Sequence, residues 1–168
     1  MRQIASAAFA AVVAVLLATG CAPEPAPTPS PTGFASEEEA FAAAEATYRA
    51  YVDAVNARRE DPDSLPDPTD MLTADAYNDH VDTQQALDER GWRVDGATLI
   101  ASVEHLSVTP DTAEISVCID ASQTRVMDSG GTDVTPPDRD ERLQVDVTVV
   151  PVSGTLLISR SIATDSEC

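Results

Sequence analysis

Apolar side chains recur at three- and four-residue steps between residues 36 and 59, which is the spacing of one face of an α-helix. Ser36 stands at the start of this segment, and Glu39 completes a capping box, in which two side chains bond to free backbone N–H groups. The glutamates that follow Ser36 also suit the positive end of the helix dipole. The pattern therefore predicts a helix over 36–59. Its predicted buried face carries Phe41, Ala44, Tyr48, Tyr51, Val52 and Val55.

A second, weaker helical pattern begins near Thr73 and ends at Gly91. Thr73 is a suitable N-cap residue, and a glycine just past a basic residue is a common helix stop. The apolar stripe of this helix would include Tyr77 and Val81. The segment 60–70 between the two helices contains three prolines, so we expect it to be irregular.

Beyond Gly91 the apolar positions alternate with polar ones, which is the period of a β-strand. Leu99, Ala101 and Val103 alternate first, and a change of phase then predicts a bulge near 104–105. Two further strands have clear apolar faces, formed by Ala113, Ile115, Val117 and Ile119 and by Leu143, Val145, Val147 and Val149. We also expect a short strand at 124–127 and a last strand at 156–162. Helices followed by antiparallel strands predict a single α+β domain over 34–168, with the helices packed on one sheet face.

The first residues form a different pattern, because positions 4–18 carry no charge and are almost all apolar. This run is shorter than the ~20 residues of a membrane-spanning helix, and Arg2 precedes it, so we expect a signal peptide over 1–20. The sequence Leu-Ala-Thr-Gly before Cys21 resembles the lipobox of bacterial lipoproteins. The resemblance implies cleavage after residue 20 and diacylglycerol on the Cys21 sulfur. An ordinary secretory signal, with Cys21 a free thiol, is the alternative.

Prolines occupy every second position from Pro23 to Pro31, within a predicted tether over 21–33. Such a run favours an extended polyproline conformation, and at ~3.1 Å per residue the segment from Ala22 to Gly33 would reach ~37 Å. With a lipidated Cys21, it would hold the domain off the outer face of the cell membrane. Thr28, Ser30 and Thr32 of this tether are candidate sites for glycosylation.

The formal net charge of −19 in 168 residues limits the partners of the protein. A chain this acidic repels nucleic acid and anionic lipid headgroups, so nucleic acid is excluded and membrane contact is expected only through the anchor at Cys21. Three cysteines are present, and because Cys21 is assigned to the lipid, Cys118 and Cys168 remain as a pair. In an exported domain such a pair indicates a disulfide, with two free thiols or an intermolecular bridge as alternatives.

A long helix, a second helix that ends in Gly91 and a strand meander together resemble the nuclear-transport-factor-2-like fold. The segments 91–96 and 113–122, with a cysteine that closes the chain, are similar to a pattern in exported lipoproteins of high-GC Gram-positive bacteria. The resemblance covers 34–168. It implies a curved sheet and a conical pocket between helix and sheet, which enzymes such as ketosteroid isomerase use.

Tyr48, Tyr51 and Trp92 are candidates to line that pocket, although the helical spacing also suits both tyrosines as core residues. Pocket enzymes of this kind need a carboxylate aimed into an apolar cavity. Asp120 and Asp146 lie on the polar sides of their strands, so we expect neither to enter the pocket.

No metal site and no cofactor are predicted. His80 is expected on a solvated helix face, and His105 is far from it in sequence, whereas a metal needs three or four converging ligands. The aspartates of 61–70 lack the glycine that a calcium loop requires, because Pro66 stands in its place.

The sequence therefore predicts a membrane-anchored exported lipoprotein. We expect it to be non-enzymatic and to bind a small apolar ligand or an envelope protein. A small pocket enzyme of the isomerase, dehydratase or hydrolase type is the alternative, and a homodimer formed through the open sheet face is another.

Overall fold

The computed structural model describes residues 33–166 and Cys168, so the predictions for the signal peptide, for Cys21 and for most of the tether lie outside it. Helix α1 (Glu37–Glu60) begins at the predicted capping box, where the Ser36 hydroxyl oxygen accepts a hydrogen bond from the backbone N–H of Glu39 at 3.1 Å. Its buried residues include the predicted Phe41, Ala44, Tyr48 and Val52. The long helix and its buried face are therefore confirmed.

A short 3₁₀ helix, η1 (Pro68–Met71), lies in the proline-rich segment that was expected to be irregular. Proline is tolerated in the first turn of a helix because the N–H that it lacks has no partner there. Asp67 caps η1 and accepts a hydrogen bond from the backbone N–H of Thr69 at 2.9 Å. The expectation was wrong because proline excludes a helix interior and not a helix start.

Helix α2 (Ala74–Asp88) follows Thr73, which takes the N-cap position without a side-chain hydrogen bond. Ala76 is the buried residue of this helix, whereas Tyr77 of the predicted apolar stripe is 45% exposed. The stripe was too weak to give the orientation of α2.

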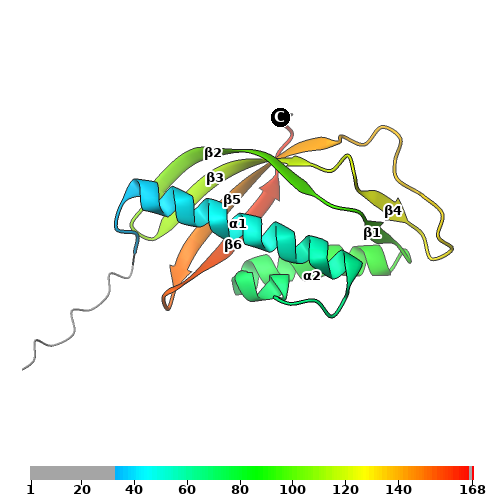
Figure 1. Ribbon diagram of the computed structural model, residues 1–168, viewed down its shortest axis with the longest axis horizontal. Coiled ribbons are helices and arrows are strands. Elements are labelled where there is room, and N and C mark those ends of the chain that lie inside the picture. The colour runs from blue at the N-terminus through cyan, green and yellow to red at the C-terminus, as the bar shows by residue number, and fades with distance from the viewer. Residues whose placement is uncertain (1–32, 167) are drawn as a thin grey trace, which may run out of the picture. The chain divides into compact units, whose positions relative to one another are not determined.

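Four antiparallel strands form the main sheet in the order β2-β3-β5-β6. They are β2 (Leu99–Thr109), β3 (Thr112–Asp120), β5 (Arg142–Val152) and β6 (Thr155–Ala163). Two short strands, β1 (Arg93–Asp95) and β4 (Arg125–Met127), pair separately. Figure 1 shows α1 crossing one face of the curved main sheet, with α2 beside the later part of α1.

The core lies between α1 and the two central strands. Ile115 pairs with Val147 and Val117 pairs with Val145, and all four side chains are buried on the face that α1 covers. Burial of each such side chain contributes ~1.5–3 kcal/mol. The strong alternation in these two strands correctly predicted their inward faces.

The edge strand β2 departs from the prediction. Ile100 packs against the core and Leu99 is 43% exposed, which is the reverse of the expected phase. The register of β2 with β3 shifts twice, once between Ile100 and Ser102 and again between His105 and Ser107. Only one bulge was predicted, so the inward and outward sides were assigned the wrong way round for the residues before the first shift. Bulges bend a strand and increase its twist.

Together these elements form two N-terminal helices packed on a curved antiparallel sheet. The predicted α+β fold class is confirmed. No helix in the described part of the chain has both the length and the apolarity to cross a bilayer.

Candidate functional site

A cleft with a volume of about 580 Å³ opens where the end of α1, the segment before α2, α2 itself and β1 meet. Its walls are mixed in character. The apolar and aromatic lining residues are Val55, Pro62, Pro68, Tyr77, Leu87, Trp92 and Val94. The polar and charged lining residues are Arg58, Arg59, Asp67, Thr69, His80, Gln84, Asp88, Arg93 and Asp95. Small-molecule sites combine apolar surface with fixed polar groups, and this cleft offers both, with the polar and charged residues in the majority.

Arg59, at the end of α1, is a half-buried cation in this cleft. Its Nη1 donates to the Oδ1 of Asn56 at 3.2 Å, to the carbonyl of Gly96 at 3.2 Å and to the Oγ1 of Thr98 at 2.9 Å. Burial lowers the pKa of the guanidinium, and the nearby Tyr51 acts in the opposite direction. An arginine nevertheless keeps its charge at neutral pH.

The segment that receives Arg59 is itself fixed. Asn56 donates to the carbonyl of Thr98 at 2.8 Å and accepts from the backbone N–H of Thr98 at 2.9 Å, which ties this segment to α1. Gly96 has a φ of 85° and lies against the carbonyl of Gln123, where no Cβ atom would fit. The Arg59 side chain is therefore bound to a rigid part of the fold.

A second arginine of the cleft is already neutralised. Arg58 forms an ion pair with Asp67 at 2.8 Å. Thr69 donates to the same carboxylate through its hydroxyl at 2.7 Å and through its N–H at 2.9 Å. These hydrogen bonds, and then the charges of Arg58 and His80, hold the pKa of Asp67 below its usual value.

A phenol and an imidazole meet behind the cleft wall. The hydroxyl of Tyr51 lies 3.1 Å from Nδ1 of His80. Burial lowers the pKa of His80, although Asp67 opposes this change, and burial raises the pKa of Tyr51 to about 12. The prediction that His80 lies on a solvated face was wrong, because α2 turns this residue toward α1 and into the cleft wall.

The three predicted pocket residues are not brought together around one cavity. Trp92 lines the cleft, with the guanidinium of Arg90 5.5 Å from its ring centroid. Tyr48 is 3% exposed, lies in the core, and its hydroxyl is 3.5 Å from that of Ser161. Tyr51 packs against the core and bonds to His80, so neither tyrosine lines the cleft.

Sequence reasoning did not select Arg58, Arg59 or Asp67. Their patterns are those of a solvated helix end and a loop. Arg58 contacts Asp67 across the intervening loop, and Arg59 contacts residues almost forty positions away. The one local signal was a pair of adjacent arginines in an otherwise acidic chain.

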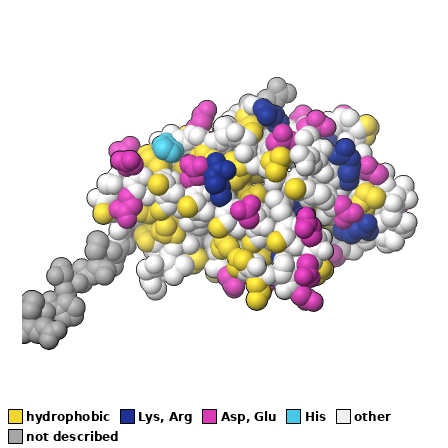
Figure 2. Space-filling view, viewed as in Figure 1, with side chains coloured by type: hydrophobic (Ala, Val, Ile, Leu, Met, Phe, Trp, Pro, Cys, Tyr) yellow, Lys and Arg dark blue, Asp and Glu magenta, His cyan; other side chains and the backbone are white. Residues whose placement is uncertain are grey.

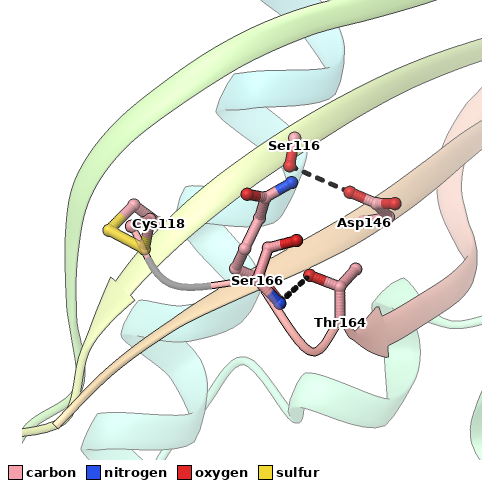
Figure 3. The surroundings of a disulfide bond; sticks show 7 residues. Ser116, Cys118, Asp146, Thr164 and Ser166 are labelled. Carbon is pink, nitrogen blue, oxygen red and sulfur yellow. Dashed lines mark hydrogen bonds between the residues drawn. A yellow bond between two sulfur atoms is a disulfide. The ribbon is translucent and has the colours of Figure 1, made fainter. Parts of the chain in front are cut away.

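Cys118 and Cys168 form the predicted disulfide, with their Cα atoms 5.7 Å apart (Figure 3). Near it lies a hollow of about 420 Å³, and half of its lining residues are acidic, including Asp120. The backbone N–H of Ser122 donates to Asp120, and the hydroxyl of Ser116 donates to Asp146 at 2.9 Å. Neither of the two aspartates considered as catalytic groups therefore lies in the large cleft.

Acidic side chains are scattered over the face of the molecule in Figure 2 and do not gather in one place. Within the residues that the structure describes, no group of three or more histidine, cysteine, aspartate or glutamate side chains is arranged to hold a metal ion. The cleft walls thus supply hydrogen bonds, apolar surface and the cation of Arg59.

No protein-family model matches this chain, and no curated protein is significantly similar to it. Several solved structures are similar to this chain, and the following two are similar at low identity. Aln2 from a Streptomyces species aligns with a TM-score of 0.45 and 12% identity, over 73% of this chain and 88% of that chain. The intermembrane space region of the chloroplast protein ARC6 aligns with a TM-score of 0.49 and 14% identity, over 76% and 97%. We draw no functional conclusion from these two alignments.

Proposed function

We propose that this protein is an exported lipoprotein, anchored through Cys21 to the outer face of the cell membrane, whose domain binds a small ligand in the cleft. The cleft is the observation that carries the binding role, because its volume of about 580 Å³ lies within the range that holds small molecules. Its apolar residues suit a ligand with an apolar part. The apolar run and the lipobox-like sequence before Cys21 support the anchor.

The place where the chain enters the domain supports the same proposal. Gly33 lies against the carbonyl of Pro110, and Phe34 packs against the core just before α1. The cleft is at the other end of α1, which at ~1.5 Å per residue is ~36 Å long. A tether attached before Phe34 would therefore leave the cleft far from its attachment point and open to ligands.

Binding in the cleft can be tested with two matched variants. Gln84 and Gln85 are neighbouring exposed residues of α2, and only Gln84 lines the cleft. Gln84→Phe should fill part of the cleft, whereas Gln85→Phe adds the same side chain outside it. We expect native mass spectrometry of the full-length protein to detect a co-purified small molecule in the wild type and in Gln85→Phe, and less of it in Gln84→Phe. Equal occupancy in all three proteins, or none in the wild type, would contradict the proposed site.

The anchor is tested separately by growing the producing cells with labelled palmitate. Label should appear on the wild-type protein and on Cys168→Ser, and it should be lost from Cys21→Ser. Cys168→Ser is the matched control because it also removes one cysteine. Label that persists on Cys21→Ser, or membrane retention that does not change in that variant, would refute the anchor.

A small pocket enzyme is the second candidate, and the Tyr51–His80 pair is the observation that favours it. A neutral imidazole in a cleft wall can accept a proton, and the phenol, with a pKa of about 12, keeps its own. Product formation by the wild type from molecules found in the cleft, abolished in His80→Gln, would support this candidate. No product from any co-purified molecule would refute it.

A homodimer or an envelope-protein partner on the sheet face that α1 does not cover has less support than a ligand in the cleft. One row across it consists of Ser107, Glu114, Thr148 and Arg160, and the next contains Glu104, Ser116, Asp146 and Ile162. In these two rows only Ile162 is apolar, and a further row nearer the turn between β5 and β6 adds the pair Val150 and Leu157. The apolar residues are few among polar ones, whereas stable interfaces usually have an apolar centre. Sedimentation of the protein as a stable dimer would contradict this ranking.

A further inference from the structure

We propose that the ligand of the cleft is a small organic acid, whose carboxylate binds the Nε–Nη2 edge of Arg59. This inference rests on the proposed function, because it names the chemical class that the same cleft would take.

The hydrogen bonds of Arg59 leave one edge of its guanidinium open. All three of its hydrogen bonds come from Nη1, and among the described residues neither Nε nor Nη2 has an acceptor. Neither atom is fully buried, since the hydroxyl of Ser64 is the one fully buried side-chain nitrogen or oxygen without a partner in the described part of the chain. The edge is thus free to bind a ligand.

The charges of the cleft leave Arg59 without a counterion. Of the three carboxylates in the lining, Asp67 pairs with Arg58, Asp95 accepts two hydrogen bonds from Arg93 at 2.9 and 3.1 Å, and Asp88 forms no ion pair with Arg59 or with any other described residue. Arg59 forms no ion pair with any described residue. A partly buried charge without a partner is costly, and in a chain with a net charge of −19 a protein counterion would be easy to supply. An anionic ligand accounts for the missing partner.

The geometry of the free edge selects a carboxylate. The Nε and Nη2 groups of arginine point in parallel and match the two oxygens of a carboxylate. The three acceptors on Nη1 already hold the guanidinium in place, so a ligand loses less affinity in ordering it. One open edge also suits a single carboxylate better than a phosphate, which carries more charge. The aromatic ring of Trp92 and the side chain of Leu87 provide surface for the apolar part of the acid.

The test compares acids with neutral molecules of the same shape. Phenylacetate and octanoate are titrated into the full-length protein in a non-ionic detergent, and so are phenylacetamide and octanamide. Trp92 reports binding through its fluorescence, because it is the single tryptophan of the chain and lines the cleft. Hydrogen bonds to charged groups are strong enough that each acid should bind about tenfold or more tightly than its amide.

Arg59→Gln should reduce the acid-to-amide affinity ratio to about one, and Arg59→Lys should restore only part of it, because lysine lacks the planar edge. Arg49→Gln is the control, since Arg49 lies on the same helix, pairs with Glu45 and does not line the cleft. This control should keep the wild-type ratio.

Several results would overturn the inference. They are equal binding of acid and amide to the wild type, an unchanged ratio in Arg59→Gln, tighter binding of inorganic phosphate than of either acid, or binding of neither member of each pair. The acid-to-amide affinity ratio of the wild type tests the inference even if a variant does not fold. The proposed function is judged independently by the co-purification experiment, so a neutral ligand found in the cleft would refute this inference alone.

Discussion

Loss of the disulfide should be the largest single effect on stability outside the core. Cys168→Ser removes the bridge between residues that are 50 positions apart in the chain. In the chain-entropy treatment, opening a loop of this length destabilises the folded state by ~4 kcal/mol. The substitution itself is mild, because Cys168 is exposed, whereas Cys118 is 5% exposed and stays in place as a small apolar side chain.

Some of the C-terminal segment should stay bound without the bridge. The N–H of Thr164 donates to the carbonyl of Gln144 at 2.8 Å, and the N–H of Gln144 donates to that of Ser166 at 3.4 Å, beyond the end of β6. The variant should therefore fold with its sheet intact. Most of the lost stability would come from a less restricted unfolded chain.

The assay is equilibrium unfolding in urea, for wild type and Cys168→Ser, each with and without a thiol reductant. With a slope of ~2 kcal/mol per molar, a loss of ~4 kcal/mol lowers the urea midpoint by ~2 M. The reductant should shift the wild type to the midpoint of the variant and should leave the variant unchanged. Midpoints of the oxidised wild type and the variant that agree within ~0.5 M would show that the bridge does not stabilise the fold.

Three further predictions concern pH, a helix cap and the loop beside the cleft. Burial lowers the pKa of His80 below 6.5 in the folded state, so the unfolded chain binds this proton more readily. The contribution of His80 to stability is therefore complete above pH 6.5 and is lost as the pH falls below it. His80→Gln should reduce the difference between urea midpoints measured at about pH 7 and about pH 5. Ser36→Ala removes the N-cap hydrogen bond of α1 and should cost ~1 kcal/mol in the same assay, and no change would show that the cap is dispensable. Gly96→Ala forces a Cβ against the carbonyl of Gln123 at a positive φ, so it should lower stability by more than ~1 kcal/mol and weaken acid binding; wild-type values for both would contradict the rigid-loop argument.

The parts of the fold that the sequence predicted well depend on local signals. The capping box marked the start of α1 within the chain, and strict alternation in β3 and β5 marked two central strands that are buried on one face. In each case neighbouring residues carry the whole signal. The packing of α1 over these strands follows from their apolar faces alone.

The parts that were missed depend on pairing between distant segments. Strand β1 has three residues and exists because it pairs with β4, some thirty positions later, so no periodicity could reveal it. In β2, each of the two shifts of register changes which residues face the core. The alternation of apolar and polar residues does not show how many such shifts a strand contains.

Most of the candidate site was missed for the same reason, and Trp92 is the one predicted pocket residue that lines the cleft. Aromatic residues of α1 were natural candidates for a pocket, but their helical spacing places Tyr48 in the core. The cleft is instead formed by polar residues at the end of α1 together with α2 and β1. Arg59 gained its role only through contacts with residues 96–98, which the sequence does not place near it.

The central claim, that the cleft at the end of α1 is a ligand site with Arg59 as its anion-binding group, is tested most directly by NMR. The side-chain N–H resonances of Arg59 and of the single tryptophan, Trp92, are recorded in the full-length protein during titration with phenylacetate. The account predicts that both resonances shift together and saturate with one dissociation constant. Saturable binding detected elsewhere in the spectrum, with both of these resonances unchanged, would contradict it.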